Sequence, residues 1–478
     1  MRALRTLIAA LARRARAVEL ATRPVPPDLQ AALQERWREL PEHVKTPAQV
    51  LGRRSTGCEG THGVFPRCDL ACTPCYHSRE ANRVRVDGAH TLAEVDAQMA
   101  MLRQLRGPGQ HAQLIGGEVT LLAPDDHAAA LQTMRRHDRK PMSMSHGDFD
   151  YDYLLALALD ANGRPRFTHL SFAGHFDSMM FGRRGIRRAS NEADLNPYRK
   201  RFCDMFQRLQ REHGITHYLA HNMTVTPRNL DQVAQVIRDC RDYGFRMFSF
   251  QPAAFLGNTA RWKDDYRAFD DDQVWQQIEA GARRPLPHDA FQMGDVRCNR
   301  TVHGAFVGER YVPLIDVADP RDLHARDIFF ELFGGMDFQT ARPLLAARLT
   351  RALAPHPHAI PLAGGWLTRF VARVGGIAAI RRHGVRPVTL VMHSFMDARV
   401  VGPAWELMRA GHSSEDAEVR AAQERLAACF YAMAHPETGE LVPACVQHSV
   451  LDPLENARLA RLMPLQAPRS PRSAGTSA

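Results

Sequence analysis

The chain has 478 residues, of which 45% are hydrophobic and 24% are charged. This balance is typical of a folded globular protein and excludes a wholly disordered chain. No run of about 18 uncharged apolar residues occurs, and no apolar core with a small-residue cleavage site is present, so neither a transmembrane helix nor a secretory signal is expected. The sequence therefore predicts a cytoplasmic protein whose nine cysteines are thiols or metal ligands.

The formal net charge is +10, and arginine far outnumbers lysine. A basic balance suits nucleic acid, anionic lipid or a phosphorylated substrate, although an arginine-rich composition without a functional role explains it equally well. No RNA-recognition pattern and no interleaving of aromatic and basic residues is present, so a nucleic-acid partner is not expected.

Residues 1–57 are predicted to form a basic helical arm and a linker. Apolar side chains in residues 1–20 recur at helical spacing, and arginines lie off that stripe. Such a helix lies on an anionic membrane surface or packs on the protein's own body, and a transit peptide is a third interpretation. Peripheral contact with the inner membrane surface is accordingly one prediction.

Residues 58–260 alternate between short apolar runs and helical patterns, which indicates stacked β-α units around a parallel sheet. We expect an α/β fold with a partial (β/α)6-type barrel, whose active site lies at the carboxyl ends of the strands. The predicted strands are 63–66, 112–117, 141–148, 167–177, 217–226 and 245–255, and the predicted helices are 91–105, 197–214 and 230–244.

The rest of the chain is predicted to extend this barrel. Residues 261–387 are expected to be mostly helical and contain a second basic amphipathic stretch, 366–383. An α+β region follows at 388–463, with a strand at 388–395 and a helix around 415–434. The tail at 464–478 is rich in proline, serine and alanine and is expected to be disordered.

Three cysteines, Cys68, Cys72 and Cys75, are spaced C-x3-C-x2-C within eight residues. A closed structural zinc site needs four ligands, and no neighbouring CxxC pair supplies the fourth. Iron–sulfur clusters also take four thiolates as a rule, so three leave one iron of a cubane open. An open iron binds an exogenous ligand, which makes the predicted site catalytic.

A second motif, Gly116-Gly117-Glu118, follows the second predicted strand. Adjacent glycines let the backbone approach a ligand closely, and an acidic residue accepts an ammonium group. The pair of motifs predicts a cofactor site.

These motifs resemble the radical S-adenosylmethionine superfamily. The aromatic Tyr76 after the third cysteine also fits, and 116–120 resembles the family's GGEPT-type motif with Val119 in place of proline. The resemblance implies a [4Fe–4S] cluster on the triad, S-adenosylmethionine on its open iron, a 5′-deoxyadenosyl radical, and a flavodoxin- or ferredoxin-type electron donor. It also implies cofactor contacts from residues near strand ends, namely Ser171, Asp177, Asn222 and Thr224. No catalytic acid, base or hydrogen donor is predicted.

Later segments are similar to the archaeal tetraether-lipid synthases and their bacterial relatives. The similar segments are 171–177, 194–199, 224–229, 250–257, 393–397 and 429–445. The resemblance implies a lipid chain or another substrate with unactivated C–H bonds. It also implies an auxiliary iron–sulfur cluster, for which the candidates are Cys58, Cys298, Cys429 and Cys445, whereas Cys203 and Cys240 lie in helical patterns and are expected in the core.

Two alternatives remain open at this point. One is a radical enzyme that matures a peptide or a cofactor. The other is a non-catalytic iron–sulfur or zinc protein, which would leave Gly116-Gly117-Glu118 without a role.

Overall fold

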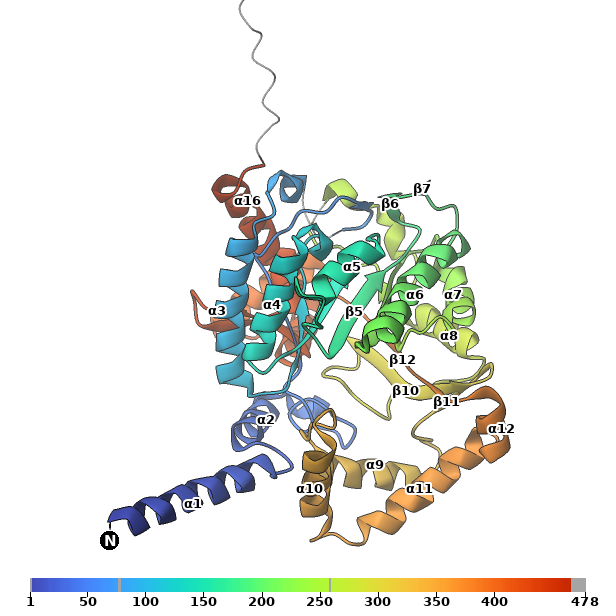
Figure 1. Ribbon diagram of the computed structural model, residues 1–478. Coiled ribbons are helices and arrows are strands. Elements are labelled where there is room, and N and C mark those ends of the chain that lie inside the picture. The colour runs from blue at the N-terminus through green and yellow to red at the C-terminus, as the bar shows by residue number, and fades with distance from the viewer. Residues whose placement is uncertain (1, 76–78, 258, 466–478) are drawn as a thin grey trace, which may run out of the picture.

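The computed structural model describes residues 2–75, 79–257 and 259–465 (Figure 1). Tyr76 and residues 466–478 of the predicted tail lie outside the described residues. The centre of the protein is an 11-stranded sheet with the strand order β11-β10-β12-β9-β8-β5-β4-β3-β1-β13-β14. The eight strands from β12 to β13 are parallel, and antiparallel strands follow at both ends.

The strands and helices have the following bounds. The strands of the large sheet are β1 (Cys58–Gly60), β3 (His111–Leu114), β4 (Lys140–Ser145), β5 (His169–His175), β8 (Thr216–Val225), β9 (Met247–Pro252), β10 (Asn299–Val307), β11 (Arg310–Pro313), β12 (Arg386–His393), β13 (Tyr431–His435) and β14 (Glu440–Pro443). A small sheet holds β2 (Ala71–Cys72), β6 (Met180–Arg183) and β7 (Ile186–Arg188). The longer helices are α1 (Arg2–Ala21), α2 (Pro27–Glu39), α3 (Gly88–Arg106), α4 (Pro124–Arg136), α5 (Tyr151–Ala158), α6 (Asn196–His213), α7 (Val233–Cys240), α8 (Asp271–Ala282), α9 (Pro320–Phe333), α10 (Arg342–Leu353), α11 (Ala359–Arg373), α12 (Gly376–His383), α13 (Ala398–Arg409), α14 (Ala417–Ala427) and α16 (Asp452–Leu462).

The parallel strands curl into an open half-barrel, as the β-α alternation predicts. Side chains alternate between the two faces of each strand. In β5, Leu170 and Phe172 point outward into the main hydrophobic core, whereas Ser171, Ala173 and His175 line the hollow inner face. Helices α3 to α8 cover the outer face (Figure 1) and fill the core with side chains such as those of α6.

One predicted strand is wrong. Residues 63–66 do not form a strand, and the first strand of the large sheet is Cys58–Gly60 instead. The apolar side chains of Val64 and Phe65 are buried, so the hydrophobic run is real, but it belongs to an irregular segment inside the core. The other five predicted strands of 58–260 coincide with β3, β4, β5, β8 and β9.

The C-terminal part of the chain completes the sheet. Strand β12 pairs in parallel with β9, and β13 pairs in parallel with β1, so segments far apart in sequence become neighbours. The helix expected around 415–434 is shorter than predicted, because α14 ends at Ala427 and β13 begins at Tyr431.

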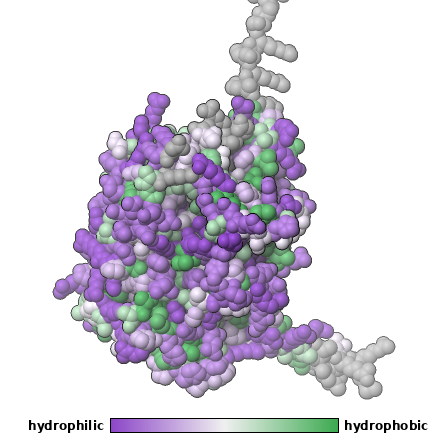
Figure 2. All heavy atoms as spheres, turned by 180° about the vertical axis from the view of Figure 1, so that it is seen from behind, coloured by the Kyte–Doolittle hydropathy of each residue, from purple (hydrophilic) through white to green (hydrophobic). Residues whose placement is uncertain are grey.

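Helices α9 to α12 and α1 lie below the sheet, on the side of the strands' amino ends (Figure 1). The second basic amphipathic stretch, 366–383, is divided between α11 and α12. Gly375 and Gly376 have φ angles of 94° and 78°, which favour glycine over other residues. Among the described residues, no helix is both long and apolar enough to cross a bilayer. The face in Figure 2 is mainly hydrophilic, with small apolar patches.

Candidate functional site

A cavity of about 2290 Å³ follows the inner face of the sheet. Its lining begins at the cysteine triad at the strands' carboxyl ends, passes small and polar side chains such as Ser171 and Ala173, and reaches His169 and Met247 at the amino ends. The cavity then continues to α9 and α11 below the sheet. Pockets for drug-sized ligands measure roughly 300–1,000 Å³, so this cavity has room for a cofactor and a long substrate together.

The triad lies at the carboxyl-end mouth of this cavity, and all three cysteines line it. Cys72 is part of β2, which pairs with β6, and the N–H of Thr73 donates to the carbonyl of Met179 (3.2 Å). The hydroxyl of Thr73 is hydrogen bonded to Tyr266 (2.8 Å). The loop is therefore held by the small sheet and by the segment after β9.

The three thiols lie close enough to affect one another's ionisation. Burial raises the pKa of Cys68 to about 12, and the nearby carboxylates and Cys75 add to the shift. Burial also raises the pKa of Cys72 well above its ordinary value, with further contributions from Cys75 and Cys68. The backbone N–H of Leu70 donates to the sulfur of Cys68 (3.4 Å). Three converging thiols, two of which resist ionisation in isolation, fit a cationic iron–sulfur centre, because the metal supplies the missing positive charge.

The glycine pair lets two backbone segments meet. The N–H of Gly117 donates to the carbonyl of Phe65 (2.6 Å), and the N–H of Glu118 donates to the carbonyl of Arg67 (2.8 Å). A Cβ on Gly117 would lie 1.9 Å from the oxygen of Arg67, and one on Gly116 would lie 2.6 Å from that of Phe65. The sequence predicted a close approach to a ligand; the structure shows a close approach to the segment that precedes Cys68. The motif therefore positions the triad.

The Glu118 carboxylate lines the cavity and is only 1% exposed. One oxygen accepts hydrogen bonds from the hydroxyls of Thr120 (2.7 Å) and Ser145 (2.8 Å), and the other accepts from the N–H of His146 (2.7 Å). These donors hold the carboxylate in one orientation, which is what recognition of a cofactor ammonium group requires.

His146 is a site residue that the sequence analysis missed. Its Nδ1 accepts from the N–H of Asp148 (3.0 Å), so its Nε2 carries the proton and donates to Asp69 of the triad loop (2.7 Å). Burial alone would lower the pKa of His146, but Glu118 and Asp69 raise it. The ring therefore connects the triad loop to the Glu118 carboxylate. Its position directly after strand β4 was the available sequence signal.

Three of the remaining predicted cofactor contacts lie on the neighbouring strands β5 and β8, and the fourth, Asp177, lies just after β5. Ser171, Asn222 and Thr224 line the cavity. Asp177 is 2% exposed and is hydrogen bonded to His175 (2.6 Å) and to the N–H of Thr224 (3.2 Å). Burial alone would raise the pKa of Asp177, but His175 and the backbone donors lower it. His175 faces the cavity, and Asp177 orients it.

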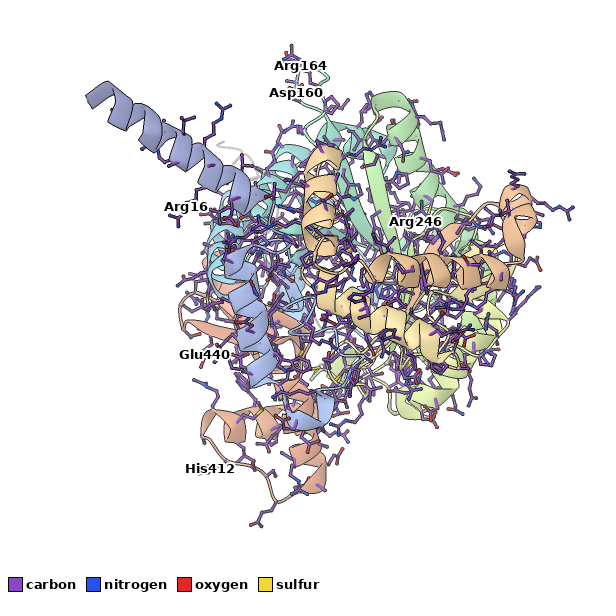
Figure 3. The ribbon with its side chains drawn as sticks, turned by 90° about the horizontal axis from the view of Figure 1, so that it is seen from below. Arg16, Asp160, Arg164, Arg246, His412 and Glu440 are labelled. Atoms are coloured by element: carbon purple, nitrogen blue, oxygen red, sulfur yellow. The ribbon has the colours of Figure 1, made fainter. Side chains whose placement is uncertain are left out.

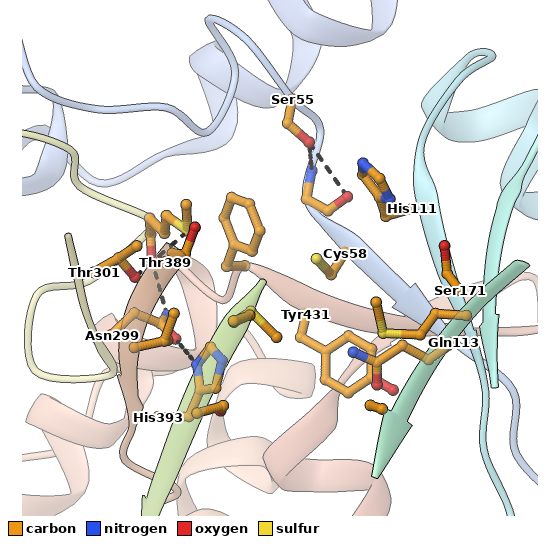
Figure 4. Close-up of a pocket in the computed structure, with 18 of the residues that line it drawn as sticks. Ser55, Cys58, His111, Gln113, Ser171, Asn299, Thr301, Thr389, His393 and Tyr431 are labelled. Atoms are coloured by element: carbon orange, nitrogen blue, oxygen red, sulfur yellow. Dashed lines mark hydrogen bonds between the residues drawn. The ribbon is translucent and has the colours of Figure 1, made fainter. Parts of the chain in front are cut away.

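The middle of the cavity contains polar groups that the sequence analysis did not identify (Figure 4). Tyr431 lies beside Cys58, and its buried hydroxyl has no hydrogen-bond partner among the described residues. The hydroxyl of Ser394 and the Nδ1 of His217 also line the cavity without a partner in that part of the chain. Burial lowers the pKa of His393 to about 4, so this ring is neutral. The unpaired groups of Tyr431, Ser394 and His217 fit contacts to a bound molecule.

Three of the four candidate auxiliary cysteines, Cys298, Cys429 and Cys445, lie close together. Burial raises the pKa of Cys298 to about 11, Arg425 opposes the shift, and Cys429 adds to it. Burial also raises the pKa of Cys445, with contributions from Cys429 and Cys298. The guanidinium of Arg425 donates to the sulfur of Cys298 (3.2 Å).

The fourth auxiliary candidate, Cys58, also lines the cavity, and burial raises its pKa to about 12. Cys203 and Cys240 are fully buried in the main core, as predicted.

No protein-family model and no curated protein matches the chain. Among solved structures, it is similar to SuiB of Streptococcus suis bound to S-adenosylmethionine, with 14% identity, 46% of each chain covered and a TM-score of 0.33. It is also similar to anSMEcpe with bound AdoMet, with 13% identity, 46% of this chain and 57% of that one covered, and a TM-score of 0.30. TYW1 with a lysine-pyruvate adduct matches at 10% identity over 45% and 71% of the chains, with a TM-score of 0.30. This chain spans about half the length of the first of these proteins. Because the identities and TM-scores are this low, the function is inferred from the geometry of the site.

Proposed function

We propose that this protein is a radical S-adenosylmethionine enzyme. One observation carries the proposal: Cys68, Cys72 and Cys75 converge at the carboxyl-end mouth of a parallel half-barrel and face a large cavity. The Gly116-Gly117-Glu118 turn contacts the same loop through backbone hydrogen bonds. Three thiols leave a fourth coordination position for a ligand, which distinguishes this arrangement from a closed structural site.

Different residues of the site would have different roles. The triad would hold a [4Fe–4S] cluster, which supplies the electron that cleaves S-adenosylmethionine to a 5′-deoxyadenosyl radical. Glu118 would accept the cofactor's ammonium group, held in place by Ser145 and by the backbone of His146. The protein's contribution is to position the reacting groups and to exclude water.

The cavity favours a long, mainly apolar substrate with an unactivated C–H bond, and we propose a lipid chain. Its lower half is lined by apolar side chains of α9 and α11, including Phe329, Phe333, Leu362 and Trp366. Burial of a hydrocarbon chain against this lining stabilises the bound state by about 25 cal/mol per Å² of apolar surface removed from water. The few unpaired polar groups near Tyr431 would orient it.

A second iron centre on Cys298, Cys429 and Cys445, with Cys58 as the remaining candidate, is the secondary proposal. The proximity of these three thiols to one another favours it, together with the hydrogen bond that Arg425 donates to Cys298. Such a centre would take thiolate ligands like the first one.

Formation of 5′-deoxyadenosine tests the main proposal. Anaerobically reconstituted protein with dithionite and S-adenosylmethionine should produce it, and Cys72→Ala should abolish both the cluster absorbance and the product. Cys203→Ala is the matched control, because it removes a core thiol far from the cavity. If wild-type protein with an intact cluster forms no 5′-deoxyadenosine, the proposal is wrong.

The substrate class has its own readout. A 5′-deoxyadenosyl radical that takes a hydrogen atom from a perdeuterated acyl chain yields deuterated 5′-deoxyadenosine, which mass spectrometry detects. Deuterium from phospholipids with perdeuterated chains supports a lipid substrate. If deuterium is transferred from deuterated peptides instead, the substrate is a peptide and the lipid proposal is wrong.

A further inference from the structure

The positive charge of this protein is concentrated in two helical segments. Residues 1–20 contain five arginines and one glutamate, and residues 341–384 contain seven arginines and no acidic residue. Together these segments carry a net charge of +11, whereas the whole chain carries +10. The rest of the chain is therefore close to neutral, and the excess positive charge lies in these two segments.

The two segments meet in the structure. The guanidinium of Arg348 in α10 donates to the carbonyl of Ala21 at the end of α1 (3.0 Å). Arg351 donates to the backbone carbonyl of Glu19 (3.0 Å) and to its carboxylate (2.8 Å). Seen from below, α1 projects from the body while α10 and α11 lie across the underside (Figure 3). We call the outward surface of α1, α10, α11 and α12 the basal face.

The basal face also exposes large aliphatic side chains. Six of the thirteen exposed large hydrophobic residues of the described chain belong to it, namely Leu11, Val18, Leu20, Ile360, Leu367 and Ile377. The last three are more than half exposed. Exposed aliphatic groups among arginines are typical of surfaces that insert into the headgroup region of a bilayer, where guanidinium groups remain at the phosphates.

The opposite side of α11 belongs to the cavity. Leu362, Trp366 and Phe370 line it, and the indole N–H of Trp366 donates to the carbonyl of Leu314 (2.9 Å). Helix α11 thus separates the cavity from the exterior, with an apolar inner side and the exposed aliphatic side chains of Ile360 and Leu367 on its outer side. Arg369 and Arg373 are paired with the buried Asp322 (2.7 and 2.6 Å), which fixes the helix to α9.

We propose that the basal face docks on an anionic phospholipid bilayer and that the cavity takes its substrate chain through the floor formed by α10 and α11. Charge complementarity selects an anionic partner. The exposed aliphatic side chains favour a bilayer over nucleic acid, because they can be buried among acyl chains but not against a phosphate backbone. Docking depends on the surface alone, and substrate entry rests on the proposed function.

Flotation with vesicles tests the docking. The full-length reconstituted protein should bind vesicles containing about 30% phosphatidylglycerol much more strongly than pure phosphatidylcholine vesicles. Binding should weaken when ionic strength rises from about 0.05 to 0.5 M. Equal binding to both vesicle types, or no binding to either, overturns the proposal. Formation of 5′-deoxyadenosine with dithionite needs no vesicles, so the same preparation separates failure of docking from failure of the proposed function.

Charge reversal locates the surface. The double variant Arg381→Glu and Arg382→Glu on exposed α12 should reduce vesicle binding about tenfold or more. The matched control is Arg458→Glu and Arg461→Glu on exposed α16 at the opposite end of the molecule (Figure 1), which should bind normally. An equal loss in both variants overturns the assignment of the surface.

Removal of aliphatic side chains distinguishes a bilayer from other polyanions. Leu367→Gln with Ile377→Gln should also weaken vesicle binding, whereas Leu454→Gln with Leu462→Gln on α16 should not. All four side chains are more than half exposed, so neither pair should unfold the protein. Unchanged vesicle binding by the first pair, together with displacement by double-stranded DNA, would replace the bilayer by nucleic acid as the partner.

Discussion

Substitution of Gly117 by alanine should detach the triad from the rest of the site. The new Cβ would lie 1.9 Å from the carbonyl oxygen of Arg67, whereas ordinary contacts begin near 3.4 Å. The two segments must separate by about 1.5 Å, which is enough to break the hydrogen bonds from Gly117 to Phe65 and from Glu118 to Arg67. Two buried hydrogen bonds left unmade cost about 3 kcal/mol in all.

The displaced residue Arg67 directly precedes Cys68, so its displacement should also move the first thiol of the metal site. We expect Gly117→Ala to lose most of its iron and sulfide after anaerobic reconstitution, and to form little 5′-deoxyadenosine. Gly116→Ala should have a smaller effect, because its Cβ would lie 2.6 Å from the carbonyl oxygen of Phe65. Iron and sulfide per chain and the free energy of unfolding are the measurements.

Gly402→Ala is the control for the same chemical change. It lies inside α13, and a Cβ there would meet no atom within 4 Å. Alanine in a helix interior is favoured over glycine by up to about 1 kcal/mol, so this variant should be as stable as the wild type or slightly more stable. If Gly117→Ala retains the wild-type iron content and stability, the steric reasoning about the triad loop is wrong.

Three further outcomes follow from buried polar groups. Arg199→Met leaves the carboxylate of Glu192 without its guanidinium partner at 2.6 Å, where both side chains are at most 1% exposed, and should lower the free energy of unfolding by about 3–5 kcal/mol in denaturant titration. The wild type should contain about eight irons per chain and Cys445→Ala about four; about four irons in the wild type excludes the auxiliary centre, and about eight in both excludes Cys445 as a ligand. Burial alone would lower the pKa of His62, but Glu455 raises it above the ordinary value of 6.5; this stabilisation is complete below pH 6.5 and is lost as the pH rises through the folded-state pKa. The stability difference between wild type and His62→Gln should therefore shrink in thermal melts at increasing pH, and a difference that grows would contradict the ion pair.

Local spacing was sufficient for part of the site. The C-x3-C-x2-C triad and the Gly116-Gly117-Glu118 turn are short-range patterns, and the position of the turn after β3 follows from the β-α alternation. Residues 63–66 show the limit of such patterns, because a buried apolar run looks the same in a strand and in an irregular core segment.

The sequence by itself determined the α/β class, five strands of the parallel sheet and the three thiols of the triad. Only the tertiary structure decided that β12 and β13 join the sheet beside β9 and β1. It alone brought His146 to the triad loop, Tyr431 into the cavity and the three cysteines 298, 429 and 445 to one place. The physical reason is that periodicity and spacing describe neighbours along the chain, whereas pairing between distant segments depends on the packing of the whole chain. The function proposed here depends on both, because the triad is local and the cavity that it faces is not.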